Sequence, residues 1–161
     1  MVTLIILAAL PALFLLLAQH FHKKPAGLRP GDLLPGTRLQ STSPTWVETD
    51  SWLGTPTLLV VFQPGCSACR SEIDTLTSIA PLFPGVRIAL LSTQSEIAGL
   101  HTPFPIYVDP GGCLLSKVSL LVTPAIYWID ASGRVRYSRV GPRSAREEES
   151  MVRKLLQETR Q

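Results

Sequence analysis

The apolar residues of this chain are arranged in two different patterns. Residues 58–62 and 86–91 form short, almost unbroken apolar runs, whereas residues 70–80 carry apolar side chains at intervals of three and four. Unbroken runs are typical of strands covered on both faces, and the wider spacing is typical of a helix with one buried face. A strand, a helix and a strand in this order predict parallel pairing with a right-handed crossover, the centre of an α/β sheet.

The rest of the pattern adds elements on either side of this centre. A short strand is expected at Trp46 and Val47, and a turn at residues 54–56. Farther along, Ser132 and Gly133 separate two apolar stretches and predict a hairpin. The remaining expectations are a short helix near residues 95–100, an extended stretch at 104–108, a helix beginning around 110–113, and the hairpin strands 125–130 and 135–140.

The C-terminal segment has the spacing of an amphipathic helix. Its buried side is predicted to consist of Ala145, Met151, Val152, Leu155 and Leu156. The net charge of +3 comes from scattered arginines rather than from a dense basic run interleaved with aromatic residues, which argues against a nucleic-acid surface. We expect the arginines near this end to form the solvated face of the hairpin and helix: Arg134, Arg136, Arg139, Arg143 and Arg146.

The first residues differ in composition from everything that follows. Residues 2–18 contain no charge and would span about 25 Å as a helix. A cleaved signal peptide is the alternative, but no Lys or Arg precedes the run and residues 16–18 make a poor cleavage site. The expected organisation is a transmembrane anchor or uncleaved signal at 1–20, a Pro- and Gly-rich linker at 21–36, and one domain at 37–161.

A pair of cysteines, Cys66 and Cys69, follows the first buried strand directly and precedes the helix. Residues three apart face the same side of a helix, so the two sulfurs can form and reopen a disulfide with little backbone motion. At a helix start, unpaired NH groups and the helix dipole favour a thiolate. We therefore predict Cys66 as the nucleophile and Cys69 as the resolving thiol.

Other readings of the cysteines stay open from the residues alone. The same spacing serves as half of a zinc site, but the other possible ligands, Cys113, His20, His22 and His101, are not paired at ligand spacing. Two inert core cysteines are a further alternative. For the odd thiol, Cys113, packing is favoured over a third redox centre or an intermolecular disulfide.

Several short motifs follow one another along the chain. They are Gly31-Asp32 followed by Pro35, Gly54-Thr55-Pro56, Cys66-Ser67-Ala68-Cys69-Arg70, and Val122-Thr123-Pro124 followed by a strand ending at Asp130. Their order and spacing resemble the membrane-anchored, thioredoxin-fold TlpA/ResA/DsbE group, with the methylamine-dehydrogenase accessory protein MauD as a particularly similar relative. The resemblance runs from Gly31 to the C-terminus and implies a thioredoxin-like α/β fold, a central mixed sheet flanked by helices.

This resemblance also implies roles for residues outside the cysteine pair. The proline matching Pro124 is cis in the family and lies against the dithiol, so Thr123 and Pro124 would form the docking edge for an extended partner chain. Glu72 matches a family acid that could accept or relay the proton of the resolving thiol; the alternative is an exposed helix glutamate that is paired with Arg70 or hydrated. Gly65 departs from the family, where many members carry Trp.

The function implied is disulfide exchange with protein partners, in either redox direction, in cytochrome or redox-enzyme maturation. No dissociable cofactor or metal is required, and the electron donor would be a membrane dithiol protein. The alternative is a copper-binding or copper-delivery domain of the same fold, although its members use C-x-x-x-C with a downstream His. A peroxidase is disfavoured because Gln63 stands where that pattern has Thr.

The expected location is the bacterial inner membrane, with a single span and the domain facing the periplasm, where disulfides form. The charge pattern opposes this orientation. Positive or histidine side chains follow the apolar segment, and the positive-inside tendency would hold them in the cytoplasm: His20, His22, Lys23, Lys24 and Arg29.

Overall fold

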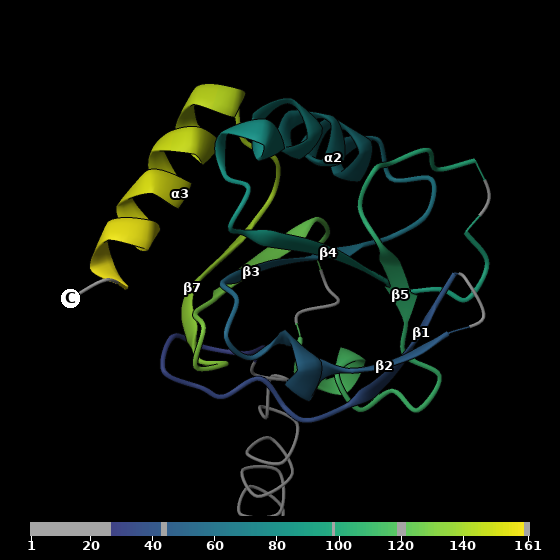
Figure 1. The fold of residues 1–161 in the computed structure, drawn as a ribbon. Coiled ribbons are helices and arrows are strands. Elements are labelled where there is room, and N and C mark those ends of the chain that lie inside the picture. The colour runs from purple at the N-terminus through teal and green to yellow at the C-terminus, as the bar shows by residue number, and fades with distance from the viewer. Residues whose placement is uncertain (1–26, 43–44, 98, 119–121, 160–161) are drawn as a thin grey trace, which may run out of the picture.

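A computed structural model describes residues 27–42, 45–97, 99–118 and 122–159 of the chain. These residues form one twisted sheet with two α-helices on one of its faces (Figure 1). The elements are β1 (Arg38–Ser41), β2 (Trp46–Glu48), η1 (Thr49–Trp52), β3 (Thr57–Phe62), α2 (Ser67–Ile79), η2 (Ala80–Leu82), β4 (Arg87–Ser92), β5 (Ile106–Val108), η3 (Leu115–Lys117), β6 (Ala125–Ile129), β7 (Val135–Val140) and α3 (Ala145–Glu158).

The sheet is mixed, as expected, with the strand order β2-β1-β5-β4-β3-β6-β7. Strand β3 pairs parallel to β4 and antiparallel to β6, and Val60 lies opposite Leu90 on one side and Ile126 on the other. Every residue of β3 is buried. Burial on both faces explains why this strand is an unbroken apolar run without polar alternation.

Each face of the sheet has its own hydrophobic cluster. On one face, Val60 and Trp128 pack against α2 and α3, which contribute Leu76 and Val152. Figure 1 shows these two helices side by side above the sheet. The other face is covered by shorter segments that supply Leu28, Trp52 and Leu114. The fold thus places the N-terminus of α2 at the end of the central strand.

Helix α3 is the predicted amphipathic helix, with one difference on its buried side. Met151, Val152 and Leu155 are buried, but Ala145 is exposed because it is the first residue of the helix. Ser144 and Glu147 form a capping box that satisfies the free NH groups of the first turn.

Two predicted helices are wrong. The described residues of 95–100 contain no helix, and Gly99 adopts a left-handed φ of 73° that interrupts helical geometry. Residues 110–113 form a turn followed only by the short 3₁₀ helix η3. There the Asp109 carboxylate accepts hydrogen bonds from the NH groups of Leu114 and Leu115, at 2.7 and 2.9 Å. A side chain that binds the backbone in this way replaces a helical turn.

The N-terminal boundary also differs from the expected one. Leu28 is buried, and its NH group donates to Lys117 O at 2.7 Å, while Gly31 N donates to Val135 O. The last part of the predicted linker 21–36 is therefore packed on the domain. The predicted anchor 1–20 lies outside the described residues, and within the described ranges no helix is long and apolar enough to cross a membrane.

Candidate functional site

The two cysteines lie where the central strand passes into a helix. After β3 ends at Phe62, a short turn includes Gly65 with a φ of 81°, a conformation that side chains rarely adopt. Cys66 N donates to Gln63 O across this turn at 3.2 Å. Cys66 is the N-cap of α2, which confirms the predicted placement at a helix start.

The two sulfurs are bonded to each other and differ in exposure. Cys66 and Cys69 form a disulfide, and the NH group of Cys69 donates to Cys66 Sγ at 3.1 Å. Cys66 is half-buried, whereas Cys69 is 1 % exposed. Once reduced, the outer sulfur would be the accessible one, and the free NH groups and dipole of the helix favour its thiolate form.

The chain before β6 lies against the outer sulfur. The Thr123–Pro124 peptide bond is cis, as the family resemblance implies. The Thr123 hydroxyl lies 3.8 Å from Cys66 Sγ, and the Thr123 carbonyl oxygen lies 3.9 Å from it. The antiparallel pairing of Val61 with Ala125 brings this segment to the end of β3. Pro124 is buried and Val122 is 50 % exposed, so the segment presents an edge beside the disulfide.

A hollow beside the disulfide is too small to hold an organic ligand. Its volume is about 20 Å³, whereas ligand pockets for small molecules are usually several hundred. Its wall includes Cys66, Cys69, Arg70, Ile97 and Leu100. A reacting group must therefore approach Cys66 from the protein surface, as a partner chain can.

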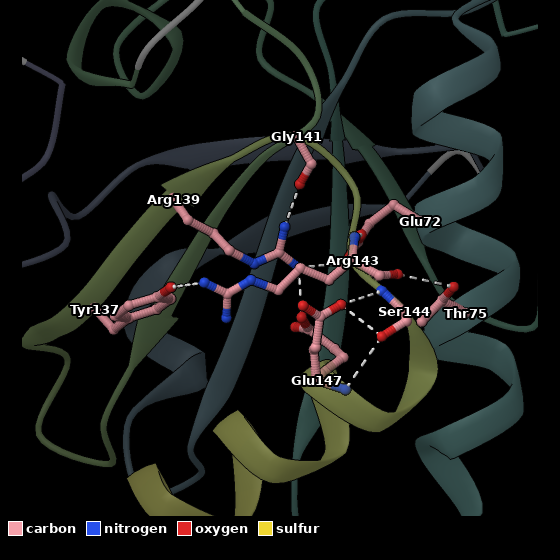
Figure 2. Close-up of polar contacts among 9 residues, drawn as sticks. Glu72, Thr75, Tyr137, Arg139, Gly141, Arg143, Ser144 and Glu147 are labelled. Atoms are coloured by element: carbon pink, nitrogen blue, oxygen red, sulfur yellow. Dashed lines mark hydrogen bonds and ion pairs between the residues drawn. The ribbon is translucent and has the colours of Figure 1, made fainter.

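Glu72 is completely buried on α2, one helical turn after Cys69. One of its oxygens accepts a hydrogen bond from Arg139 Nη2 at 2.6 Å, and the other accepts from the NH group of Arg143 at 2.9 Å (Figure 2). The alternative of an exposed, hydrated side chain is wrong. The carboxyl group lies on the same helix face as the resolving cysteine, because residues three apart are neighbours there.

Arg139 does not belong to the solvated arginines expected from the sequence. Its side chain is 6 % exposed and makes ion pairs with both Glu72 and Glu148, at 2.6 and 2.5 Å. It also donates a short hydrogen bond to the carbonyl oxygen of Gly141 (Figure 2). Because β7 pairs Arg139 opposite Ile126, the arginine faces the helix-covered core.

Glu148 was missed by the sequence analysis and is completely buried on α3. Its position was detectable, because residues 148, 151, 152 and 155 follow the i, i+3, i+4, i+7 spacing of one helix face. Burial raises the pKa of Glu148, and the negative charge of Glu72 acts in the same direction while Arg139 and Arg143 oppose it.

Cys113 is exposed, so the prediction that it packs in the core is wrong. The turn through Gly111 and Gly112 leaves its side chain outside, and the next residue, Leu114, fills the core instead. No group of three or more His, Cys, Asp or Glu side chains within the described part of the chain is arranged to hold a metal ion.

Comparisons with known proteins support the fold. No protein-family model and no curated protein sequence matches the chain. Among solved structures, a protein assigned as thiol:disulfide interchange protein DsbE from Chlorobium tepidum is 20 % identical, with a TM-score of 0.69 over 81 % of this chain and 97 % of that one. The thioredoxin domain of a thiol-disulfide oxidoreductase from Bacteroides vulgatus is 18 % identical, with a TM-score of 0.69 over 80 % and 99 %.

A third solved structure has a similar fold. A secreted Mycobacterium tuberculosis disulfide oxidoreductase is 19 % identical, with a TM-score of 0.61 over 73 % of this chain and 94 % of that one. These similarities confirm the thioredoxin-like α/β fold. The chain therefore combines that fold with a C-x-x-C pair at the N-terminus of α2 and a cis-proline beside it.

Proposed function

We propose that this protein is a thiol–disulfide oxidoreductase that exchanges disulfides with protein partners through Cys66 and Cys69. The observation that carries the proposal is the disulfide at the N-terminus of α2, with one half-buried and one buried sulfur, against the cis peptide before Pro124. The solved structures of similar fold support it, since three of them are described as thiol:disulfide interchange or oxidoreductase proteins.

The reaction is a two-step exchange. In the reduced chain, the Cys66 thiolate attacks a partner disulfide, forms a mixed disulfide and releases one partner thiolate. Cys69 then loses its proton, and its thiolate attacks Cys66 Sγ. The Cys66–Cys69 bond forms, the partner's second thiolate leaves, and both partner thiolates take up protons. Two electrons pass from the domain to the partner, and the reverse sequence oxidises the partner.

Partner chains dock, in this proposal, at the edge formed by Thr123 and Pro124. An extended segment can add to this edge through backbone hydrogen bonds, a common mode of peptide recognition. The exposed Val122 side chain and the closeness of Thr123 to Cys66 support this position. A docked segment would hold its disulfide against the accessible sulfur.

Glu72 is the group we assign to accept the proton of Cys69 in the second step. It is buried, it lies one turn from Cys69, and its anionic form is held by Arg139 and by the NH group of Arg143. A carboxylate at that place can take up the thiol proton inside the core, where water has little access. The proton then passes to solvent or to the leaving partner thiolate.

Glu72→Gln tests this assignment without leaving Arg139 unpaired, since Glu148 still binds it. Near neutral pH we expect the resolving step of the variant to be about 100-fold slower than that of the native chain, which is the low end of the usual effect of a general base. We also expect the pKa that controls exchange to be higher in the variant. The measurement is the pH profile of single-turnover exchange with a model disulfide. A profile that superimposes on that of the native chain would remove Glu72 from the mechanism.

The chain is further proposed to be tethered by residues 1–20 in the bacterial inner membrane, facing the periplasm. The uncharged run 2–18 supports the tether. A tether raises the effective concentration of the domain toward membrane-bound partners. We assign these partners as a membrane dithiol electron donor and as proteins of cytochrome or redox-enzyme maturation, as in a MauD-like variant of the family.

Cys113 offers a direct test of the orientation, because its thiol is free and exposed. In intact cells expressing the full chain, a membrane-impermeant maleimide should label Cys113, and Cys113→Ser should lose this label. Labelling that requires cell lysis would place the domain in the cytoplasm instead.

Trapping tests the proposed function itself. With Cys69→Ser, a protein partner should remain bound to Cys66 through a disulfide that reductant releases. If no partner is retained under oxidising conditions, disulfide exchange is not the function of this pair.

A further inference from the structure

Two buried carboxyl groups meet at one guanidinium nitrogen between α2, β7 and α3. Arg139 Nη2 lies 2.6 Å from an oxygen of Glu72 and 2.5 Å from an oxygen of Glu148. Both glutamates are 0 % exposed, and the Arg139 side chain is 6 % exposed. With both carboxyls ionised, the group would carry a net negative charge in the core, which is costly away from water.

A proton on one of the two carboxyls removes this excess charge. The hydrogen bonds show which carboxyl is the better place for that proton. Both oxygens of Glu72 accept donors, from Arg139 and from the NH group of Arg143. In Glu148, Oε2 binds Arg139, but Oε1 is buried without a hydrogen-bond partner among the described residues. The better-stabilised anion is Glu72.

We propose that Arg139 and Glu148 are positioning residues for the proposed disulfide exchange: Glu148 retains the proton of this carboxyl pair, so that Glu72 stays ionised and ready to accept the proton of Cys69. This inference rests on the proposed function, because it assigns a role to residues that act through Glu72. It also explains why a second acidic side chain is buried on α3, where a hydrophobic residue would fit the pattern of the helix.

Arg139 connects the helix that carries Cys69 with the cis-proline segment. Through Glu72 it holds the helix that carries Cys69, and it donates a hydrogen bond to the carbonyl oxygen of Gly141 (Figure 2). Gly141 N donates in turn to Pro124 O at 2.8 Å. The carboxyl pair is therefore linked through Arg139 to the helix of the resolving cysteine on one side and to the cis-proline segment on the other.

The charged and titratable groups around Glu148 come from every element packed on it. Strand β7 supplies Arg139, and α2 supplies Glu72. The segment after β7 supplies Arg143, whose guanidinium donates to the Tyr137 hydroxyl at 2.6 Å. Among the described residues, the hydrogen bond and ion pair of the Glu148 carboxyl are made with Arg139. Burial and the charge of Glu72 raise the pKa of Glu148 against these cations.

The test is a carboxyl-carbon NMR titration of the full chain in detergent, oxidised and reduced, with Glu148→Gln to assign the signal. We expect the Glu148 carboxyl to titrate at a higher pH than the glutamates on the surface. Its midpoint should rise further on reduction, because the Cys66 thiolate adds negative charge. Titration of Glu148 together with the exposed glutamates would overturn the proposal, and this readout does not depend on exchange activity.

Exchange kinetics give the second readout. In Glu148→Gln, which keeps the size of the side chain, we expect the loss of the inflection that this proton adds to the pH–rate profile. Glu149→Gln, the same change at a more exposed position on the same helix, should retain it. A profile of Glu148→Gln identical to that of Glu149→Gln would overturn the proposal. If the native chain itself exchanges no disulfides at any pH, the proposed function fails, whereas the Glu148 titration remains measurable.

Discussion

Cys69→Ser is expected to hold the chain and its partner together as a mixed disulfide, and Cys66→Ser to abolish both the complex and exchange. The physical reason is the difference in exposure between the two sulfurs. Cys66 can be reached from the surface and lies at the helix N-terminus, so it forms the first bond with the partner. Without Cys69, nothing displaces the partner from it.

For Cys66→Ser we expect an exchange rate lower by on the order of 1000-fold or more, the scale of losing a nucleophile. The remaining thiol, Cys69, is 1 % exposed and cannot be attacked by, or attack, a protein disulfide. Both measurements are made on the full chain, by non-reducing gel analysis and by exchange with a model disulfide. Cys113→Ser is the matched control and should behave like the native chain.

A complex that forms on Cys66→Ser and is absent from Cys69→Ser would reverse the assigned roles. A complex that depends on Cys113 would move the reactive thiol to the exposed loop. Either result contradicts the mechanism proposed from the geometry at the start of α2.

Arg139→Gln is expected to lower the free energy of unfolding by about 3–5 kcal/mol at neutral pH, the usual cost of breaking a buried ion pair by removing one partner. Glutamine cannot neutralise the negative charge that remains on the carboxyl pair when Glu148 holds one proton, and Glu72 and Glu148 are both completely buried. The measurement is denaturant unfolding of the native and variant chains. Arg146→Gln, a change at an exposed arginine, should stay within about 0.5 kcal/mol.

The pH dependence of this loss has a definite sign. A carboxyl whose pKa is raised in the folded state stabilises the fold below its unfolded pKa, and that contribution is lost as pH rises through the folded value. The pKa of Glu148 is already raised by burial, and removing Arg139 removes a cation that opposes the shift. The destabilisation should therefore shrink as pH falls from neutral into the acidic range. A loss independent of pH would mean that packing, and not charge, accounts for it.

The strands and helix at the centre of the fold could be predicted from the sequence, because their apolar residues follow the spacing of buried strands and of a helix. The run at β3 is apolar throughout since both faces are covered, and α2 repeats its apolar positions at helical spacing. The position of Cys66 and Cys69 between these two patterns likewise indicated that the pair lies at the helix start. The family resemblance supplied the cis peptide before Pro124, which no local pattern indicates.

The failures arise where particular side-chain and backbone contacts, and not the spacing of apolar residues, decide the structure. The turn after Asp109 is held by a side chain that binds the backbone, so it replaced a predicted helix. Arg139 looks like a surface residue by type, and only its pairing opposite Ile126 and its ion pairs turn it inward. Burial of Cys113 was expected from residue statistics, but the loop exposes it.

The central claim, that Cys66 and Cys69 cycle between a disulfide and two thiols, is tested most directly by redox titration. The full chain is equilibrated in glutathione buffers of stepped potential, and free thiols are counted by alkylation and mass. In Cys113→Ser, which removes the other exposed thiol, we predict one reversible transition in which two thiols appear together, and this transition should be absent when Cys66→Ser or Cys69→Ser is added. A pair that stays oxidised or stays reduced at every accessible potential, or that changes irreversibly, would contradict the account.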